Sequence, residues 1–178
     1  MIRNIRQDIQ NQVDDWQAMG QPALMQRFIL EKGRAWIPQA LPKPFERLTP
    51  KNCFQNSYVL AELDHHYKFV EGLALNQNVD MLVHHAWCVD ADNRVVDLTW
   101  EKPAECLYFG IRFNHFRVVK HQTDITGCYS ILDSDSGLNT KFMFEESPKL
   151  KRLAEGWHKI AKESRQVREE LLAQFKRG

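Results

Sequence analysis

A cysteine, a histidine and an aspartate follow one another in three short phrases between residues 52 and 100. Cys53 lies in Asn-Cys-Phe-Gln-Asn, His85 in His-His-Ala-Trp and Asp97 in Val-Val-Asp-Leu-Thr-Trp. These are the residue types of a thiol nucleophile, of the general base that takes its proton, and of the carboxylate that orients the base. The three phrases together indicate a cysteine-dependent enzyme of acyl transfer.

A thiol nucleophile is favoured at the start of a helix, and the sequence predicts a helix start close to Cys53. Thr49 and Pro50 have the pattern of a helix cap followed by proline at the first helical position, which predicts a helix from near residue 50 to about Asp64. Cys53 would then lie in the first turn, where unpaired N–H groups and the helix dipole favour a thiolate. The alternative is an ordinary cysteine on an amphipathic helix.

The base and its carboxylate are expected on neighbouring strands, 81–89 and 94–100. Asp97 interrupts a very apolar run, and a buried carboxylate without a partner is costly, so a histidine one strand away is a suitable partner. His85 and Asp97 share a face only if the connection has an odd number of residues. A three- or five-residue loop around Ala91 would place them directly opposite, whereas an even loop would separate them. The alternative is that His84 and His85 are merely half-buried strand residues.

Stabilisation of an oxyanion requires at least two donors. The backbone N–H of Cys53 is one candidate, and the second is a neighbouring side-chain amide, that of Asn52, Gln55 or Asn56. For Asn56, a helix-packing or capping contact is an equally good interpretation. Trp87 and Trp100 either line the substrate cleft or belong to the core.

The same phrases form a family pattern. The chain resembles the transglutaminase-like core of the papain-like cysteine enzyme superfamily, and specifically its small bacterial and phage-type members. The resemblance covers roughly residues 50 to 113. It is carried by residues 53–56, 85–87 and 96–100, together with Phe-Val-Glu-Gly at 69–72 and Tyr-Phe-Gly at 108–110.

The resemblance implies a helix packed on an antiparallel sheet, with Cys53 as nucleophile, His85 as base and Asp97 as orienting acid. It implies an amidohydrolase or acyltransferase that works through a thioester, and it leaves peptidase, deamidase and transglutaminase-like activities open. The surroundings of the nucleophile are Lys-Asn-Cys-Phe, whereas animal transglutaminases have Gly-Gln-Cys-Trp. The chain also has no room for accessory β domains, so calcium-regulated crosslinking is not expected. The alternative function is a binding module that keeps the fold without turnover.

Composition narrows the classes of partner. The 178 residues suit one domain, and 24 basic against 23 acidic residues give a net charge of +1, so neither nucleic acid nor a membrane surface is expected as a partner. We expect a cytoplasmic protein without a cofactor, acting on a peptide, a protein or a small amide. A metal site is the chemical rival, but adjacent strand histidines point apart. Its candidate ligands are His65, His66, His84, His85 and Cys88.

The pattern of elements predicts an α+β fold in one domain, residues 1–178, with a papain-like core and flanking helices. Residues 1–48 are expected to form a helical extension, which is either an ordinary connector or a cover over the cleft. Residues 49–120 form the core, 121–146 a loop region and 147–178 a final helix that packs across the domain or binds a partner. Within these parts, helices are predicted at 2–19 and 22–33, an extended proline-rich segment at 37–44, and further strands at 67–75, 107–113 and 116–119.

Overall fold

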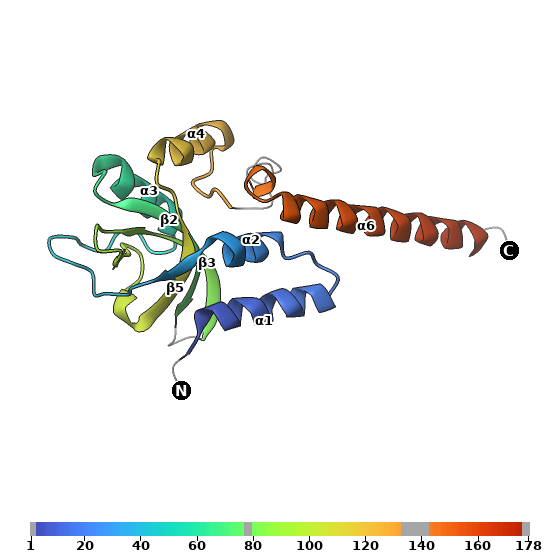
Figure 1. Ribbon diagram of the computed structural model, residues 1–178, viewed down its shortest axis with the longest axis horizontal. Helices are drawn as coiled ribbons and strands as arrows, with labels where there is room; N and C mark the ends of the chain where they lie inside the picture. The colour runs from blue at the N-terminus through green and yellow to red at the C-terminus, as the bar shows by residue number, and fades with distance from the viewer. Residues whose placement is uncertain (1–2, 77–79, 133–142, 176–178) are drawn as a thin grey trace.

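The computed structural model describes residues 3–76, 80–132 and 143–175 and has an α+β architecture (Figure 1). Antiparallel strands form a single five-stranded sheet, and helices lie along one of its faces. The elements are α1 (Ile5–Ala18), α2 (Leu24–Lys32), β1 (Arg34–Trp36), α3 (Cys53–Leu63), β2 (Lys68–Asn76), β3 (Met81–Val89), β4 (Val95–Val96), β5 (Cys106–Arg112), α4 (Phe116–Thr126) and α6 (Pro148–Phe175).

The sheet has the order β1-β5-β2-β3-β4 and curls until its two edges meet. Ile37, directly after β1, bridges Arg94, directly before β4, and the N–H of Val95 donates to the Ile37 carbonyl at 2.8 Å. The curl creates a concave inner face with its own apolar cluster, which consists of Trp36, Val70, Ala74, Trp87, Val89, Val95, Cys106 and Tyr108.

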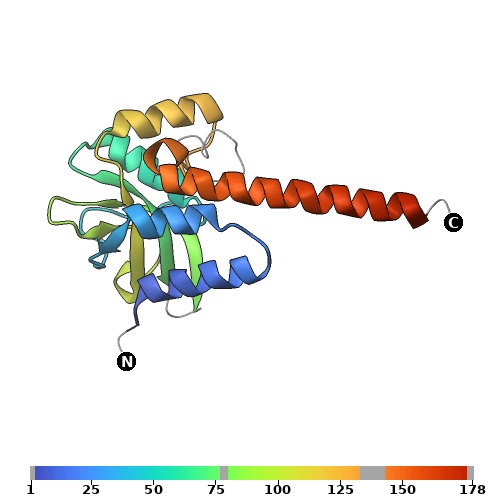
Figure 2. The same cartoon turned by 45° about the vertical axis from the view of Figure 1, so that its right-hand side comes forward.

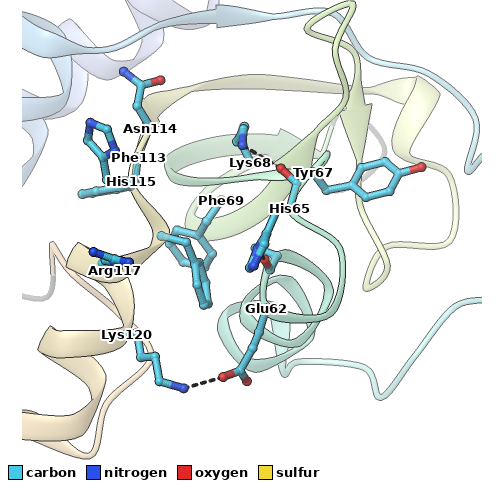
Figure 3. Close-up of a pocket in the computed structure, with 12 residues that line it drawn as sticks. Glu62, His65, Tyr67, Lys68, Phe69, Phe113, Asn114, His115, Arg117 and Lys120 are labelled. Carbon is cyan, nitrogen blue, oxygen red and sulfur yellow. Dashed lines mark hydrogen bonds and ion pairs between the residues drawn. The ribbon is translucent and has the colours of Figure 1, made fainter.

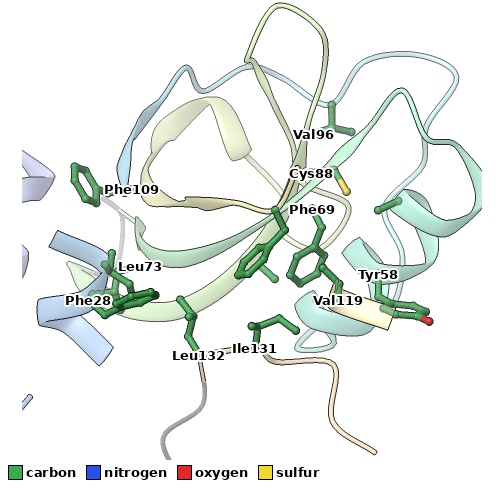
Figure 4. Packing of buried hydrophobic residues seen from close by; sticks show 14 of the residues in the cluster. Phe28, Tyr58, Phe69, Leu73, Cys88, Val96, Phe109, Val119, Ile131 and Leu132 are labelled. Carbon is green, nitrogen blue, oxygen red and sulfur yellow. The ribbon is translucent and has the colours of Figure 1, made fainter. Parts of the chain in front are cut away.

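The outer face of the sheet carries the main hydrophobic core. Helices α1, α2 and α3 contact the central strands and cover this face (Figures 1 and 2). Alternation along β2 and β3 directs Phe69, Leu73 and Cys88 to this side, where they pack with side chains such as Phe28 and Tyr58 (Figure 4). Helix α3 therefore packs on one face of the sheet, while the strands present other side chains to the concave face.

Two glycines allow the central strands to approach closely. Gly72 of β2 lies opposite Gly110 of β5 on one side and opposite His85 of β3 on the other. A Cβ atom on Gly72 would collide with the backbone of Phe109 and Gly110. Because neither residue has a side chain, β5 can pack closely against β2, which in turn pairs with the part of β3 that carries His85.

The N-terminal helices are confirmed. Ile5, Ile9 and Val13 form the buried stripe of α1, whereas Trp16 remains 39% exposed at its outer end. Helix α2 ends where the sequence places a glycine, at Gly33.

The predicted start of the nucleophile helix is wrong by three residues. Thr49 and Pro50 lie in the preceding loop, Asn52 occupies the N-cap position, and Cys53 is the first helical residue. Lys51 has a φ of 67°, a left-handed conformation that interrupts any helix begun at Pro50. This later start still leaves Cys53 at the end of the helix where its N–H groups lack intrahelical partners.

Two strand predictions are wrong, and one strand was not predicted. Strand 94–100 is reduced to the two residues of β4, because Asp97 Oδ1 accepts from the N–H groups of Thr99 and Trp100 at 2.8 and 3.3 Å and turns the chain. Residues 116–119 are the first turn of α4 rather than a strand, so α4 also occupies part of the predicted loop region. The short edge strand β1 was not predicted. Residues 133–142 of the loop region lie outside the described part of the chain.

Helix α6 leaves the body of the molecule (Figures 1 and 2). Its first turns pack against α2 through buried Leu150 and Ala154, and further along Ile160 is 56% exposed. The prediction of a helix that packs across the domain therefore holds only for its beginning. Several further apolar residues of α6 have side chains outside what the structure describes, namely Trp157, Ala161, Val167, Leu171 and Phe175. Within the described residues no helix combines the length and apolarity needed to cross a membrane.

Candidate active site

His85 and Asp97 form a buried pair on the concave face of the sheet. His85 points inward from β3, and its Nε2 lies 2.8 Å from Oδ2 of Asp97, which directly follows β4. The exposed fraction is 2% for His85 and 0% for Asp97. The expectation that the carboxylate of this apolar segment finds a histidine partner is confirmed.

The register of the β3–β4 hairpin differs from the direct opposition that we expected. Val89 pairs with Val95, so the connection consists of five residues, 90 to 94, and the number is odd as required. The loop is centred on Asp92 rather than Ala91, however, and the register carried past Val96 places Asp97 across from Trp87. His85 and Asp97 thus share a face but meet diagonally, a separation that a histidine ring can span.

Asp97 is held by more than the histidine. Tyr108 of β5 donates its hydroxyl to Oδ2 at 2.9 Å, and the backbone N–H groups of Thr99 and Trp100 donate to Oδ1. Burial by itself raises the pKa of Asp97, but the charge and hydrogen bond of His85, with the donors from Thr99 and Tyr108, lower it further than burial raises it. The net effect is a lowered pKa, so the group is a carboxylate at neutral pH.

Cys53 completes the group from the start of α3. Its side chain is 7% exposed and lies close enough to His85 to help raise the pKa of that ring. Because Nε2 of the ring faces Asp97, Nδ1 is the atom left for the thiol. The structure therefore brings the three predicted residues together in the order thiol, imidazole, carboxylate.

The surroundings favour a charged imidazole. Burial lowers the pKa of His85, but the negative charge of Asp97 and the hydrogen bonds with Asp97 and Cys53 outweigh it and raise the pKa to about 9. At neutral pH the ring therefore carries its proton.

The two tryptophans have different environments. Trp100 is half-buried and stacks on the ring of His85, with centroids 4.3 Å apart and planes at 19°. Trp87 is fully buried in the concave cluster, at 6.1 Å from His85 and next to Tyr108. Trp100 thus covers the ring of His85, whereas Trp87 belongs to the core.

The three side-chain amides near Cys53 also differ in their surroundings. Asn56 is buried, and its Nδ2 donates to the Thr49 carbonyl at 2.9 Å and to the Thr99 hydroxyl at 3.0 Å. Both amide hydrogens are then used to tie the loop before α3 to the segment after Asp97. Asn52 and Gln55 are exposed at the helix start, and neither is fixed by these contacts.

The other cysteines provide a contrast. Cys88 donates to the Ser57 carbonyl and Cys106 to the Lys102 carbonyl. Burial is the main cause that raises the pKa of both thiols. The pKa of Cys106 is raised to about 11, and that of Cys88 is raised further. Cys128 is half-buried, more exposed than Cys53.

A second carboxylate–histidine pair lies on the other side of β3, and the sequence did not reveal it. Glu71 of β2 is fully buried, and its Oε1 lies 2.8 Å from Nε2 of His84. Ser130 donates its hydroxyl to the same carboxylate at 2.6 Å, and the N–H groups of Ile131 and Leu132 donate at 2.6 and 2.9 Å. A charged residue inside an apolar strand was the available signal, the same one that identified Asp97.

A cleft larger than any that borders the start of α3 in the described residues lies away from this chemistry. It has a volume of about 630 Å³ and is lined at the far end of α3 by Glu62 and His65, with Lys120 of α4 opposite (Figure 3). The 11 residues of α3 span roughly 15 Å, which separates this cleft from Cys53. A smaller groove of about 290 Å³ lies at the start of α3, where Asn52 and Phe54 line it together with residues 127–130.

The candidate metal ligands are dispersed. His84 and His85 leave β3 on opposite sides and bind Glu71 and Asp97, while His66 binds Asp64 at 2.8 Å. Among the described residues, no three histidine, cysteine, aspartate or glutamate side chains are grouped as a metal would need.

Comparisons of the chain with models of known families, with curated proteins and with solved structures find no match. The functional interpretation therefore depends on the residues and their geometry.

Proposed function

We propose that the protein is a cysteine-dependent amidohydrolase or acyltransferase with Cys53 as nucleophile, His85 as general acid and base, and Asp97 as the orienting group. The observation that supports this most is the position of His85, whose ring lies between a thiol and a buried carboxylate. A histidine kept only for packing would not need a partner at each nitrogen.

The chemistry would start from a thiolate–imidazolium pair. The Cys53 sulfur attacks the carbonyl carbon of an amide or ester, and the electron pair of the carbonyl moves to oxygen. When the tetrahedral intermediate collapses, the bond to the leaving amine or alcohol breaks and His85 supplies that group's proton, which leaves a thioester on Cys53. Water or a second amine then attacks the thioester, gives its proton to His85 and releases the sulfur.

Asp97 and the helix start would support these steps. The carboxylate keeps the imidazole in the orientation that presents its other nitrogen to sulfur, and it stabilises the positive ring. The N–H of Cys53 lies at the first position of α3, where it has no intrahelical partner, and it can donate to the oxyanion. The exposed amide of Asn52 or Gln55 is the candidate for the second donor.

The finer fold assignment belongs to the same proposal. A helix that begins at the nucleophile and packs on a curled antiparallel sheet, with the base on β3 and the acid after β4, is the arrangement expected of a papain-like, transglutaminase-like core. The α1 and α2 segment covers the outer face of the sheet, whereas His85 and Asp97 lie on the concave face. This position argues against a cover over the cleft and for a structural N-terminal extension.

Alkylation by iodoacetamide tests the activated thiol with an internal control. Exposure alone would make Cys128 react faster than Cys53, because Cys128 is half-buried and Cys53 is buried. If His85 activates the thiol, Cys53 is instead labelled first, and it still reacts at pH 6, where an unperturbed thiol is almost fully protonated. Labelling is followed for each cysteine by peptide mass spectrometry on the native protein.

The His85→Ala variant should lose the advantage of Cys53 while Cys128 keeps its rate. Labelling of Cys128 before Cys53 in the wild-type protein would overturn the proposal and would favour a binding module that merely has this fold.

A further inference from the structure

The cleft at the far end of α3 lies between two parts of the chain that are distant in sequence (Figure 3). One wall is formed by the last turn of α3 and the start of β2. The other wall is formed by the segment that joins β5 to α4 and by the first turns of α4. The volume of about 630 Å³ lies within the range of sites for small molecules.

Aromatic side chains form the base of this cleft. Phe69 of β2 and Phe113, which directly follows β5, are buried, and their ring centroids lie 6.0 Å apart. The N–H of Phe113 donates to the Phe69 carbonyl at 2.9 Å, so the backbone holds the two rings together. Phe116 of α4 is half-buried and lines the same cleft. The base therefore offers aromatic surface to a planar group of a ligand.

The walls of the cleft are positively charged. Lys68 of β2 and two residues of α4, Arg117 and Lys120, line it together with one carboxylate, that of Glu62. Glu62 pairs with Lys120 at 2.6 Å (Figure 3). Lys68 donates to the His65 carbonyl at 2.6 Å, and in the described part of the chain neither Lys68 nor Arg117 has a carboxylate partner. Two positive charges, one on each wall, are therefore not compensated by an anion.

The start of α4 adds to this positive field. His115 occupies the N-cap position, and among the described residues no side chain caps the first N–H groups of this 11-residue helix. These N–H groups and the helix dipole favour an anion. His115 and Arg117 both line the cleft, so the helix start borders the same space as the two uncompensated cations.

We infer that this cleft binds a small organic phosphate with an aromatic ring, of mononucleotide size, with its ring against the aromatic base and its phosphate between Lys68 and Arg117. A phosphate monoester carries a charge of about −1.5 to −2 at neutral pH, which matches the two cations, whereas a carboxylate would compensate only one of them. The planar fork of the arginine also fits phosphate oxygens. The inference is independent of the proposed function, because the cleft and Cys53 lie at opposite ends of α3.

Isothermal titration calorimetry with three matched compounds tests both halves of this inference. AMP carries a ring and a phosphate, adenosine lacks the phosphate, and ribose 5-phosphate lacks the ring. We expect AMP to bind about tenfold more tightly than either of the other two, because only AMP contacts both the cations and the aromatic base. Adenosine or ribose 5-phosphate that binds as tightly as AMP would overturn the inference.

Paired variants locate the site. Lys68→Gln and Arg117→Gln should each weaken binding of AMP about tenfold, the size of one charge-assisted contact. Arg152→Gln is the matched control, because Arg152 lines another basic cleft, between α1, α2 and α6, and its loss should leave the affinity unchanged. Phe116→Ala should weaken AMP about fivefold and leave ribose 5-phosphate unaffected, since it removes only aromatic surface.

The result that supports the inference is binding of AMP that both Lys68→Gln and Arg117→Gln weaken and Arg152→Gln does not. Absence of AMP binding at a concentration of about 1 mM would overturn it. An affinity that Arg152→Gln lowers and the other two variants leave unchanged would overturn it as well, because the ligand would then lie in the cleft beside α6.

Discussion

The ring of Trp100 stacks on the ring of His85 at a centroid distance of 4.3 Å, and the same residue's N–H donates to Asp97. Trp100 therefore contacts both members of the buried pair, one through its side chain and the other through its backbone. The turn that follows β4 thus also positions the tryptophan that stacks on His85.

Trp100→Ala should slow alkylation of Cys53 about threefold to tenfold at neutral pH, because the loss of one aromatic contact leaves the imidazole free to turn away from the thiol. Trp100→Phe should keep most of the rate. Trp16→Ala, a change in an exposed tryptophan of α1, is the matched control and should have no effect. Equal rates for Trp100→Ala and the wild-type protein would show that the stacking does not orient His85.

Asp97→Asn should reduce acyl transfer to a simple ester by about a thousandfold or more, since the amide keeps the shape of the carboxylate but not its charge. It should also lower the free energy of unfolding by about 3 kcal/mol, because a buried charged pair loses one partner. Tyr108→Phe removes only one donor to Asp97 and should cost far less activity. A small loss of activity for Asp97→Asn would indicate that Asp97 is structural.

The pH dependence of stability follows from His85. Its pKa is raised from 6.5 to about 9 in the folded protein, because Asp97 and Cys53 outweigh the opposing effect of burial. The proton then stabilises the fold fully below pH 6.5, and this contribution is lost as the pH rises through 9, by about 3 kcal/mol at most. Urea unfolding at several pH values gives the free energy of unfolding of the wild-type protein and of His85→Gln as a function of pH. The difference between the two curves is the contribution of His85. Curves that run parallel between pH 6.5 and 9 would contradict the raised pKa.

The same proton should control turnover. Above pH 9 the imidazolium that gives its proton to the leaving group is lost, so acyl transfer should decline there. Alkylation by iodoacetamide needs only the thiolate and should not decline. A common decline of both rates would point instead to loss of the fold at high pH.

Gly72→Ala tests the close contact of β2 with β5. The added Cβ would meet the backbone of the neighbouring strand, so we expect a loss of about 3 kcal/mol in the free energy of unfolding, or failure to fold. Gly156→Ala is the control, because a Cβ there meets no atom within 4 Å. Urea denaturation of both variants compares them, and a loss below 1 kcal/mol for Gly72→Ala would contradict the packing described.

The sequence predicted best what depends on local periodicity. Residues 81–89 form the predicted strand, and α1 lies within the predicted helix 2–19, with Ile5, Ile9 and Val13 buried. The short apolar run at 116–119 has no period of its own, and it became the first turn of α4. The prediction of a strand over 94–100 was wrong beyond Val96 for a local reason as well. The side chain of Asp97 accepts from the N–H groups that a longer strand would pair with its neighbour.

For the candidate site, the sequence indicated the partners of His85 but not their register. The one-residue shift of the loop centre from Ala91 to Asp92 changed direct opposition into a diagonal contact. The donors to Glu71 from residues 130–132 were beyond prediction, because they lie about sixty residues away in a segment without a pattern. A buried carboxylate in a strand signals that a partner exists and does not tell which one.

The central claim is that Cys53 accepts an acyl group with the help of His85, and trapping of the acyl-enzyme tests it most directly. The protein is mixed with p-nitrophenyl acetate, and release of nitrophenolate is followed while the modified residue is located by mass spectrometry. We predict a rapid burst with acetylation of Cys53, absent in Cys53→Ala and at least a hundredfold slower in His85→Ala. Acetylation spread over lysines and Cys128, with no burst and no dependence on His85, would contradict the account.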